Sequence, residues 1–236
     1  MIGNSKMRVF FIENRYKVEI SLPKGLIEKL PERIMLFSTV QYLDLIEDVK
    51  AQLEKKGKIV LGRKAQHSKY DFQVLGCGIE RFDDNFDAFL FVGDGMFHPK
   101  ALVVKNDKPC FFYNPLSQAY GTVSEKDAEL FEKRRKGAIA KFISSENIGV
   151  LISTKPGQKA SLSLVSQLEE MFPEKRFYLL LSNEINPESL MNFPFAEAFV
   201  NTACPRIAYD EQEKFFRPVV NAEDIIEFSN LSKAMR

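Results

Sequence analysis

The sequence predicts an α/β protein made of two similar three-layer lobes, each with a mostly parallel sheet, joined by a long helix. Continuous apolar runs, such as residues 88–92 and 148–153, are typical of strands that are buried on both faces of a parallel sheet. Segments with apolar residues at three- and four-residue steps alternate with these runs. The alternation occurs on both sides of a long charged segment, which indicates two lobes.

The first half is expected to contain strands and helices in alternation. Residues 7–19 read as one or two short strands, a short helix follows from about Gly25, and a strand covers residues 34–38. An amphipathic helix comes next and ends near Gly57, which is a suitable C-cap. Its apolar face is formed by Val40, Leu43, Ile46, Val49 and Leu53. Further short strands are expected at 58–62, 71–77, 88–92 and 110–114.

The second half repeats this pattern after the charged segment 124–145, which is predicted to be one helix. Strands are expected at 148–153, 176–182 and 198–204, with helices between them and a last short helix at 221–228. The expected domains are therefore a short N-terminal extension (1–32), a first lobe (33–123), the connecting helix (124–145) and a second lobe (146–236).

Composition excludes several classes of protein. The formal net charge of +1 gives no electrostatic reason for DNA or anionic membrane binding. No apolar run is long enough to span a membrane, and the N-terminus lacks the apolar core of a signal peptide. Three cysteines in 236 residues do not form a disulfide framework. A cytoplasmic protein with reduced thiols is expected.

Two cysteines lie where ligands collect in α/β proteins, beyond the carboxyl ends of strands. Cys77 and Cys204 each follow an apolar run and precede a turn, and Pro205 cannot continue a central strand. Each thiol is either a small buried hydrophobe or one ligand of a shared metal, for which thiolates select zinc, copper(I) or iron–sulfur clusters. Arg206 would bring positive charge to Cys204. Cys110, at the start of a strand, is expected to be a packing residue.

Two loops after strands are candidate substrate-binding elements. In one, Gly93 and Gly95 free the backbone to approach a ligand, Asp94 offers a carboxylate, and His98 is a base, a ligand or a helix-entry residue. The other loop does not have the spacing of a nucleotide P-loop. Its alternatives are a grip on a carboxylate and a plain tight turn, and its candidate residues are Thr154, Lys155, Gly157 and Gln158.

Four phrases together resemble the archaeal diphthamide synthase family, in that family's order. They are "FSTVQYLD…VLGC", "FVGDGMFHPKAL", "GVLISTKPGQ" and "FVNTACPRIAYD". The resemblance implies three similar α/β domains around a [4Fe–4S] cluster, with one cysteine from each domain. It also implies that S-adenosylmethionine is cleaved to a 3-amino-3-carboxypropyl radical, which is added to a histidine of elongation factor 2, and that the proteins are dimers.

On this resemblance Cys77 and Cys204 are the cluster ligands of the second and third domains. Gly93, Asp94, Gly95 and His98, with the loop from Thr154 to Gln158 and Arg206, are expected at the S-adenosylmethionine pocket. Residues 1–32 would be a remnant of the first domain, and they contain no cysteine.

The missing cysteine leaves three hypotheses open. The chain is a radical transferase whose third ligand comes from Cys110, from another subunit or from a non-cysteine group. Alternatively, it is a non-catalytic partner subunit or small-molecule-binding relative, or a metal-free enzyme that uses S-adenosylmethionine or another small molecule. The first two are compatible with a homodimer or with a heterodimer containing a full-length relative.

Overall fold

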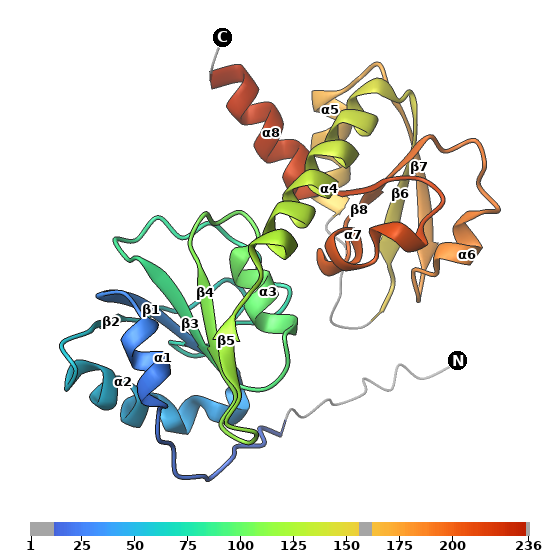
Figure 1. Ribbon diagram of the computed structural model, residues 1–236. Helices are drawn as coiled ribbons and strands as arrows, with labels where there is room; N and C mark the ends of the chain where they lie inside the picture. The colour runs from blue at the N-terminus through green and yellow to red at the C-terminus, as the bar shows by residue number, and fades with distance from the viewer. Residues whose placement is uncertain (1–11, 156–161, 235–236) are drawn as a thin grey trace. The chain divides into compact units, whose positions relative to one another are not determined.

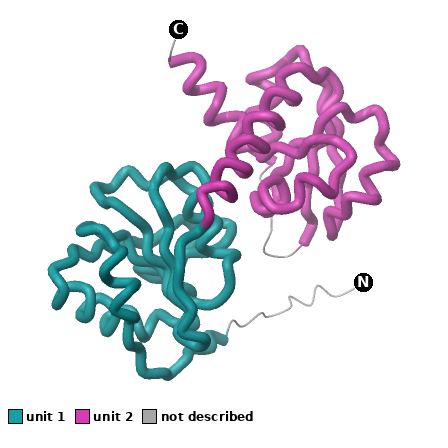
Figure 2. Tube along the Cα trace, viewed as in Figure 1, with its two compact units in different colours: residues 1–123 teal, residues 124–236 magenta. Residues whose placement is uncertain are grey.

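A computed structural model describes residues 12–155 and 162–234. These residues divide between Val123 and Ser124 into two compact units (Figure 2). Each unit is a mixed α/β structure around one sheet (Figure 1). Gly157 and Gln158, two of the predicted site residues, lie outside the described residues. Among the described helices, none has the length and hydropathy that crossing a bilayer requires.

The sheet of the first unit is parallel except at one edge. Its strands are β1 (Arg33–Ser38), β2 (Ile59–Leu61), β3 (Ala88–Val92), β4 (Cys110–Tyr113) and β5 (Tyr120–Thr122). They lie in the order β2-β1-β3-β4-β5, and only the pair β4–β5 is antiparallel. The four parallel strands therefore end at the same edge of the sheet.

Helices and aromatic loops cover the two faces of this sheet. One face packs against α1 (Lys24–Lys29), the 3-10 helix η1 (Val40–Leu45) and α2 (Ile46–Glu54). The other face carries the helix α3 (Phe97–Val103) and a group of phenylalanines in edge or tilted contact, Phe37, Phe82, Phe86 and Phe89. β1 and β3 are buried on both faces because both faces are covered, as their apolar sequences predict.

The sheet of the second unit is entirely parallel. Its strands are β6 (Asn147–Ser153), β7 (Arg176–Ser182), β8 (Ala198–Asn201) and β9 (Val219–Asn221), in the order β7-β6-β8-β9. Counted within each unit, the first four strands of both sheets have the same order, second-first-third-fourth. This shared order confirms the predicted mixed α/β fold with two mostly parallel sheets.

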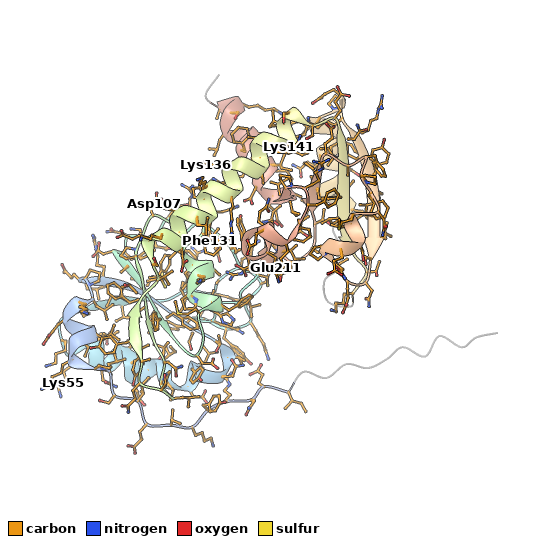
Figure 3. The ribbon with its side chains drawn as sticks, turned by 45° about the vertical axis from the view of Figure 1, so that its right-hand side comes forward. Lys55, Asp107, Phe131, Lys136, Lys141 and Glu211 are labelled. Carbon is orange, nitrogen blue, oxygen red and sulfur yellow. The ribbon has the colours of Figure 1, made fainter. Side chains whose placement is uncertain are left out.

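Among the described residues, five α-helices cover the second sheet. The long helix α4 (Glu125–Ser144), α5 (Leu162–Met171) and α8 (Ala222–Ala234) pack on one face around Phe142, Ile148 and Ile225. Short helices α6 (Pro187–Leu190) and α7 (Arg206–Asp210) cover the other face around Leu151 and Phe199. Lys136 and Lys141 mark the course of α4 in Figure 3.

The structure differs from the sequence-based expectation in several elements. Residues 12–19 form no strand, and 71–77 form only one isolated bridge, between Ser38 and Gln73. The predicted amphipathic helix begins as the 3-10 turn η1 and becomes α-helical only at Ile46. β8 ends at Asn201, so Cys204 lies in the turn beyond the strand. β9 has only three residues and is recognisable only through its pairing with β8.

Two glycines of the second unit differ in what a side chain would meet. A Cβ at Gly149 would lie 2.6 Å from Cδ1 of the fully buried Phe199, whereas a Cβ at Gly137 of α4 meets nothing within 4 Å. We expect Gly149→Val to lower the free energy of unfolding by about 1–3 kcal/mol through overpacking. Gly137→Ala should raise it by roughly 0.5–1 kcal/mol, because alanine favours the helix. Urea unfolding of both variants tests this, and equal stabilities would contradict the packing described for β6.

Candidate functional site

The strand order of each sheet places one topological switch point at its carboxyl edge. In the first unit the order reverses between β1 and β3, and in the second unit between β6 and β8. Ligands of open α/β sheets bind at such points, because the loops after the two strands diverge there and leave a crevice. The loops that follow β3, β6 and β8 are those that the sequence singled out, and the Cys77 segment lies beside the end of β1.

The Cys77 segment is anchored to the end of β1 by backbone hydrogen bonds. Ser38 N–H donates to Phe72 O over 2.7 Å, and Val74 N–H donates to Ser38 O over 2.9 Å. Gly78 N–H closes the turn on Leu75 O. Cys77, half-buried, lies within this turn and not at the tip of a strand, because the segment leaves the sheet after one bridge.

The turn of Cys77 also lies against the start of α3. A Cβ at Gly76 would come within 1.8 Å of Cε1 of Phe97, so this ring covers the glycine directly. Any larger residue at position 76 would require the Phe97 ring to move. The structure thus brings Cys77 and the loop 93–98 together at one switch point, and Gly76 was not singled out from the sequence.

The loop 93–98 combines a buried start with an exposed tip. Gly93 is buried, and its N–H donates to Tyr113 O over 2.9 Å. Asp94 and Gly95 are exposed, and Gly95 has a φ of +67° that favours glycine. The ring of His98 stacks on Phe91 with centroids 5.7 Å apart and meets the edge of Phe97. His98 is therefore held by aromatic packing, while Asp94 has its carboxylate at the surface.

An N-terminal strap, defined here as residues 12–16, lies on the same switch point. Tyr16 N–H donates to Gln41 O over 2.8 Å, and the Tyr16 ring stacks on Tyr42 of η1 with centroids 5.1 Å apart. Arg15 pairs with Asp44 at 2.7 Å and with Glu13 at 2.9 Å. The strap therefore covers Tyr42 with an aromatic ring and fixes that ring with ion pairs.

Glu13 is the centre of the polar contacts that hold the strap. It accepts hydrogen bonds from Lys69 Nζ and from the hydroxyl of Tyr70, each over 2.8 Å. Contacts with Lys69, Arg15 and Tyr70 lower the pKa of Glu13 to about 2. The strap is not predicted by the sequence, because residues 7–19 have the pattern expected of one or two short strands; residues 7–11 of that segment lie outside the described residues.

In the second unit, the loop after β6 begins at the predicted residues Thr154 and Lys155. Both are exposed; Thr154 N–H donates to Ser182 O, and Lys155 Nζ lies 3.6 Å from a carboxylate oxygen of Glu184. Glu184 also lines a cavity of about 390 Å³ beside the edge strand β7. The remaining walls of this cavity are mostly leucine, isoleucine and phenylalanine.

The turn that carries Cys204 is held by two asparagines at the ends of β8 and β9. Asn201 Nδ2 donates to Cys204 O over 2.9 Å and to Asn221 Oδ1 over 2.8 Å, and Asn201 Oδ1 accepts from Ala203 N–H. Asn221 Nδ2 in turn donates to Pro205 O. The half-buried Cys204 is thus placed by buried amides, which the end of each apolar run could have signalled.

Arg206 starts the helix after Cys204 and is almost fully buried. Its Nε donates to Asp210 Oδ2 over 2.7 Å, within the same turn of α7. Beside it, the hydroxyl of Tyr209 donates to Asp224 Oδ2 over 2.6 Å. Burial and the charge of Asp224 raise the pKa of Tyr209. α7 is therefore fastened to α8 directly behind the cysteine turn.

Cys110 differs from the other two cysteines. It is fully buried at the start of β4, at the opposite end of the strand from the switch point, and burial raises the pKa of its thiol strongly. Within the part of the chain that the structure describes, no three His, Cys, Asp or Glu side chains form a group able to hold a metal ion. The described residues therefore offer two accessible thiols, one in each unit, and fit only part of the ligand set of an iron–sulfur cluster.

Comparisons with known proteins agree in one family. The family model described as "Putative diphthamide synthesis protein" matches residues 1–229. A 2-(3-amino-3-carboxypropyl)histidine synthase of Pyrococcus horikoshii is 31% identical over 205 residues, which are 85% of this chain and 58% of that protein. One of Methanocaldococcus jannaschii is 30% identical over 203 residues, covering 80% of this chain and 58% of that protein.

A solved structure extends the comparison to three dimensions. The crystal structure of Dph2 from Pyrococcus horikoshii with a 4Fe-4S cluster matches with a TM-score of 0.71 at 28% identity, over 88% of this chain and 60% of that chain. The chain thus spans less than two thirds of the length of these relatives.

The asparagine pair predicts a coupled effect on stability and on the cysteine turn. Asn201→Ala should lower the free energy of unfolding by about 1–3 kcal/mol, because it leaves the amide of Asn221 and the carbonyl of Cys204 without their buried partner. Labelling of the Cys204 thiol by Ellman's reagent should become faster. Asn192→Ala, which removes one exposed hydrogen bond to Ser189 O, is the matched control. Unchanged stability and labelling in Asn201→Ala would refute the role of the pair.

The strap predicts a pH-dependent contribution of Glu13. Because the pKa of Glu13 is about 2 in the folded chain and its ordinary value is 4.5, the stabilising effect of Glu13 is complete above pH 4.5 and is lost as the pH falls toward 2. Glu13→Gln should be less stable than the parent at pH 7 and equal to it near pH 2, in urea unfolding. It should also speed trypsin cleavage after Arg15. Glu19→Gln on the same exposed segment should change neither, and an equal response of the two variants would contradict the anchoring.

Proposed function

Because the chain belongs to the family of diphthamide synthesis proteins, we propose that it takes part in making 2-(3-amino-3-carboxypropyl)histidine. The reaction moves the 3-amino-3-carboxypropyl group of S-adenosylmethionine to a histidine of elongation factor 2 in the cytoplasm. In net terms, the bond from the sulfonium sulfur to the transferred carbon breaks and a bond to a ring carbon of the histidine forms. The ring releases a proton and 5′-methylthioadenosine leaves, so the net reaction consumes no oxidant.

The observation that carries this proposal is the placement of Cys77 and Cys204. Each is half-buried and lies in a turn at the switch point of its own sheet, beside a loop with exposed polar groups. Structural cysteines are usually sealed in the core, as Cys110 is, whereas ligands must be reachable. Two accessible thiols at equivalent positions of two similar units support a shared role, and their approach to one another stays a prediction.

The proposed role of both thiols is ligation of an iron–sulfur cluster. The radical route requires such a cluster, and the described residues offer two of its thiolate ligands. We propose that the remaining ligand comes from another subunit, so that the active species is a homodimer or a heterodimer with a full-length relative. Cys110 is unsuited to replace it, because its sulfur is fully buried.

S-adenosylmethionine is proposed to bind through the loops at the two switch points. Asp94 and the backbone at Gly93 and Gly95 provide a carboxylate and a close approach in the first unit. Lys155 provides a cation in the second unit, where it now faces Glu184. Gln158 and Arg206 remain proposed ligands, and Arg206 would have to exchange Asp210 for a substrate carboxylate.

A second candidate function is supported by the incomplete ligand set. A non-catalytic partner subunit, or a small-molecule-binding relative, needs the fold and the loops but not a full cluster site. Both candidates predict the same fold, so iron content separates them.

The test is anaerobic reconstitution of the full chain with iron and sulfide, alone and together with a full-length relative. If the chain ligates the cluster, Cys77→Ser and Cys204→Ser each lose most of the bound iron and the electron paramagnetic resonance signal of the reduced cluster. Cys110→Ala keeps both. Transfer of the 3-amino-3-carboxypropyl group to elongation factor 2 is assayed in the same samples.

The outcomes assign the function directly. If the chain alone binds iron and has transfer activity, the chain is a catalytic transferase. Iron in the mixture that is insensitive to both serine variants, with activity due to the relative, establishes the partner subunit. Absence of iron from every sample overturns the ligand role of Cys77 and Cys204.

A further inference from the structure

Tyr42 is buried, and its hydroxyl group has no partner among the described residues. The residue has no exposed surface, and no described residue makes a hydrogen bond with its hydroxyl oxygen. The hydroxyl of Thr39, three residues earlier at the end of β1, is also buried without a hydrogen bond among the described residues. A buried hydroxyl without a partner is costly, so two of them at one switch point indicate a site whose polar partner is a bound molecule.

The surroundings of Tyr42 indicate what kind of molecule this is. One side of its ring is covered by the stacked ring of Tyr16, and the backbone of Gly93 lies close to the ring, whose Cδ2 is 3.5 Å from the position a Cβ would take there. Burial and the nearby charge of Asp94 raise the pKa of Tyr42 to about 12, so its hydroxyl stays protonated and can donate. A flat aromatic platform beside a glycine loop and a surface carboxylate suits a planar ring joined to a group with hydroxyls.

We propose that Tyr42 is the stacking platform for the adenine ring of a nucleoside ligand, and that Tyr16 of the strap holds this place until the ligand displaces it. Asp94 accepts hydrogen bonds from the ribose hydroxyls, and the hydroxyls of Thr39 and Tyr42 pair with the polar edge of the nucleoside. The inference rests on the proposed function for the identity of the nucleoside, S-adenosylmethionine or its product 5′-methylthioadenosine.

The contacts that hold the strap are weak enough for a ligand to displace it. It is held by surface ion pairs and one backbone hydrogen bond, and Ile12 at its start is exposed. Surface ion pairs contribute little each, so a ligand that stacks on Tyr42 can replace the Tyr16 ring. Competition of this kind lowers the apparent affinity by the fraction of molecules whose strap is closed.

The test is calorimetric binding of three probes to the full chain: S-adenosylmethionine, 5′-methylthioadenosine and methionine. Tyr16→Ala should raise the affinity for the first two by about 2- to 12-fold, the range of one aromatic pair, and leave methionine unchanged. Tyr16→Phe, which keeps the ring, and Ile12→Ala, which changes the strap without touching the stack, should match the parent. Tyr42→Phe should lower the affinity several-fold without lowering the melting temperature.

A second readout is independent of affinity. Saturating 5′-methylthioadenosine should speed trypsin cleavage after Arg15, because the strap is displaced, while methionine should not. A plain structural strap would be protected or unaffected.

The outcomes separate this inference from the proposed function. If S-adenosylmethionine binds equally to the parent, Tyr16→Ala and Tyr42→Phe, the platform is wrong and the proposed function stands. If 5′-methylthioadenosine responds as expected but the chain neither ligates iron nor supports transfer, the platform stands and the proposed function falls. If neither nucleoside binds the parent or Tyr16→Ala, the platform is overturned.

Discussion

The structure depends on one constraint: parallel strands run in the same direction, and the chain must cross back after each one. The carboxyl ends of the strands therefore lie at a single edge of each sheet. In both units the second strand pairs outside the first, and the third and fourth lie on its other side. This order makes the loops after the first and third strands diverge at one point. Cys77, Asp94, Thr154 and Cys204 all lie at such points, although they are far apart in the sequence. The two units therefore have the same strand order and place their candidate residues at equivalent points.

Much of the fold could be predicted from the sequence, because buried parallel strands are continuous apolar runs. β1, β3, β6 and the helix α4 fall within or next to their predicted ranges, and the family resemblance read from four phrases is confirmed by the family model. The failures have two causes. Residues 12–19 alternate apolar and polar residues as a strand does, but their charged side chains bind to other segments of the first unit. β9 has too few residues to be recognised without its neighbour.

The sequence points to the loops that form the candidate site but not to the groups that hold these loops, and the ligand roles of the loop residues stay predictions. Glycines and cysteines after apolar runs are visible in a sequence, since they interrupt a pattern. The groups that hold them are not, because they come from other elements: Phe97 covers Gly76, and Asn221 pairs with Asn201. A buried amide network of this kind fixes a turn more tightly than apolar packing does, since each member is costly to leave unpaired. The turn of Cys204 is therefore held from the ends of β8 and β9.

The difference in burial between Cys110 and the two half-buried cysteines also determines which thiols are oxidised first in air. The rate at which a cysteine is oxidised increases with its exposure and with the fraction present as thiolate. Cys110 is buried, and its raised pKa keeps its thiol protonated. Sulfenic and then sulfinic acid would therefore form on Cys77 and Cys204 first, in turns whose shape is set by glycine contacts and amide hydrogen bonds. A preparation exposed to oxygen would keep its melting temperature and its circular dichroism spectrum, although the thiols of Cys77 and Cys204 are oxidised. Measurements of folding therefore do not report whether the two cysteines are still reduced.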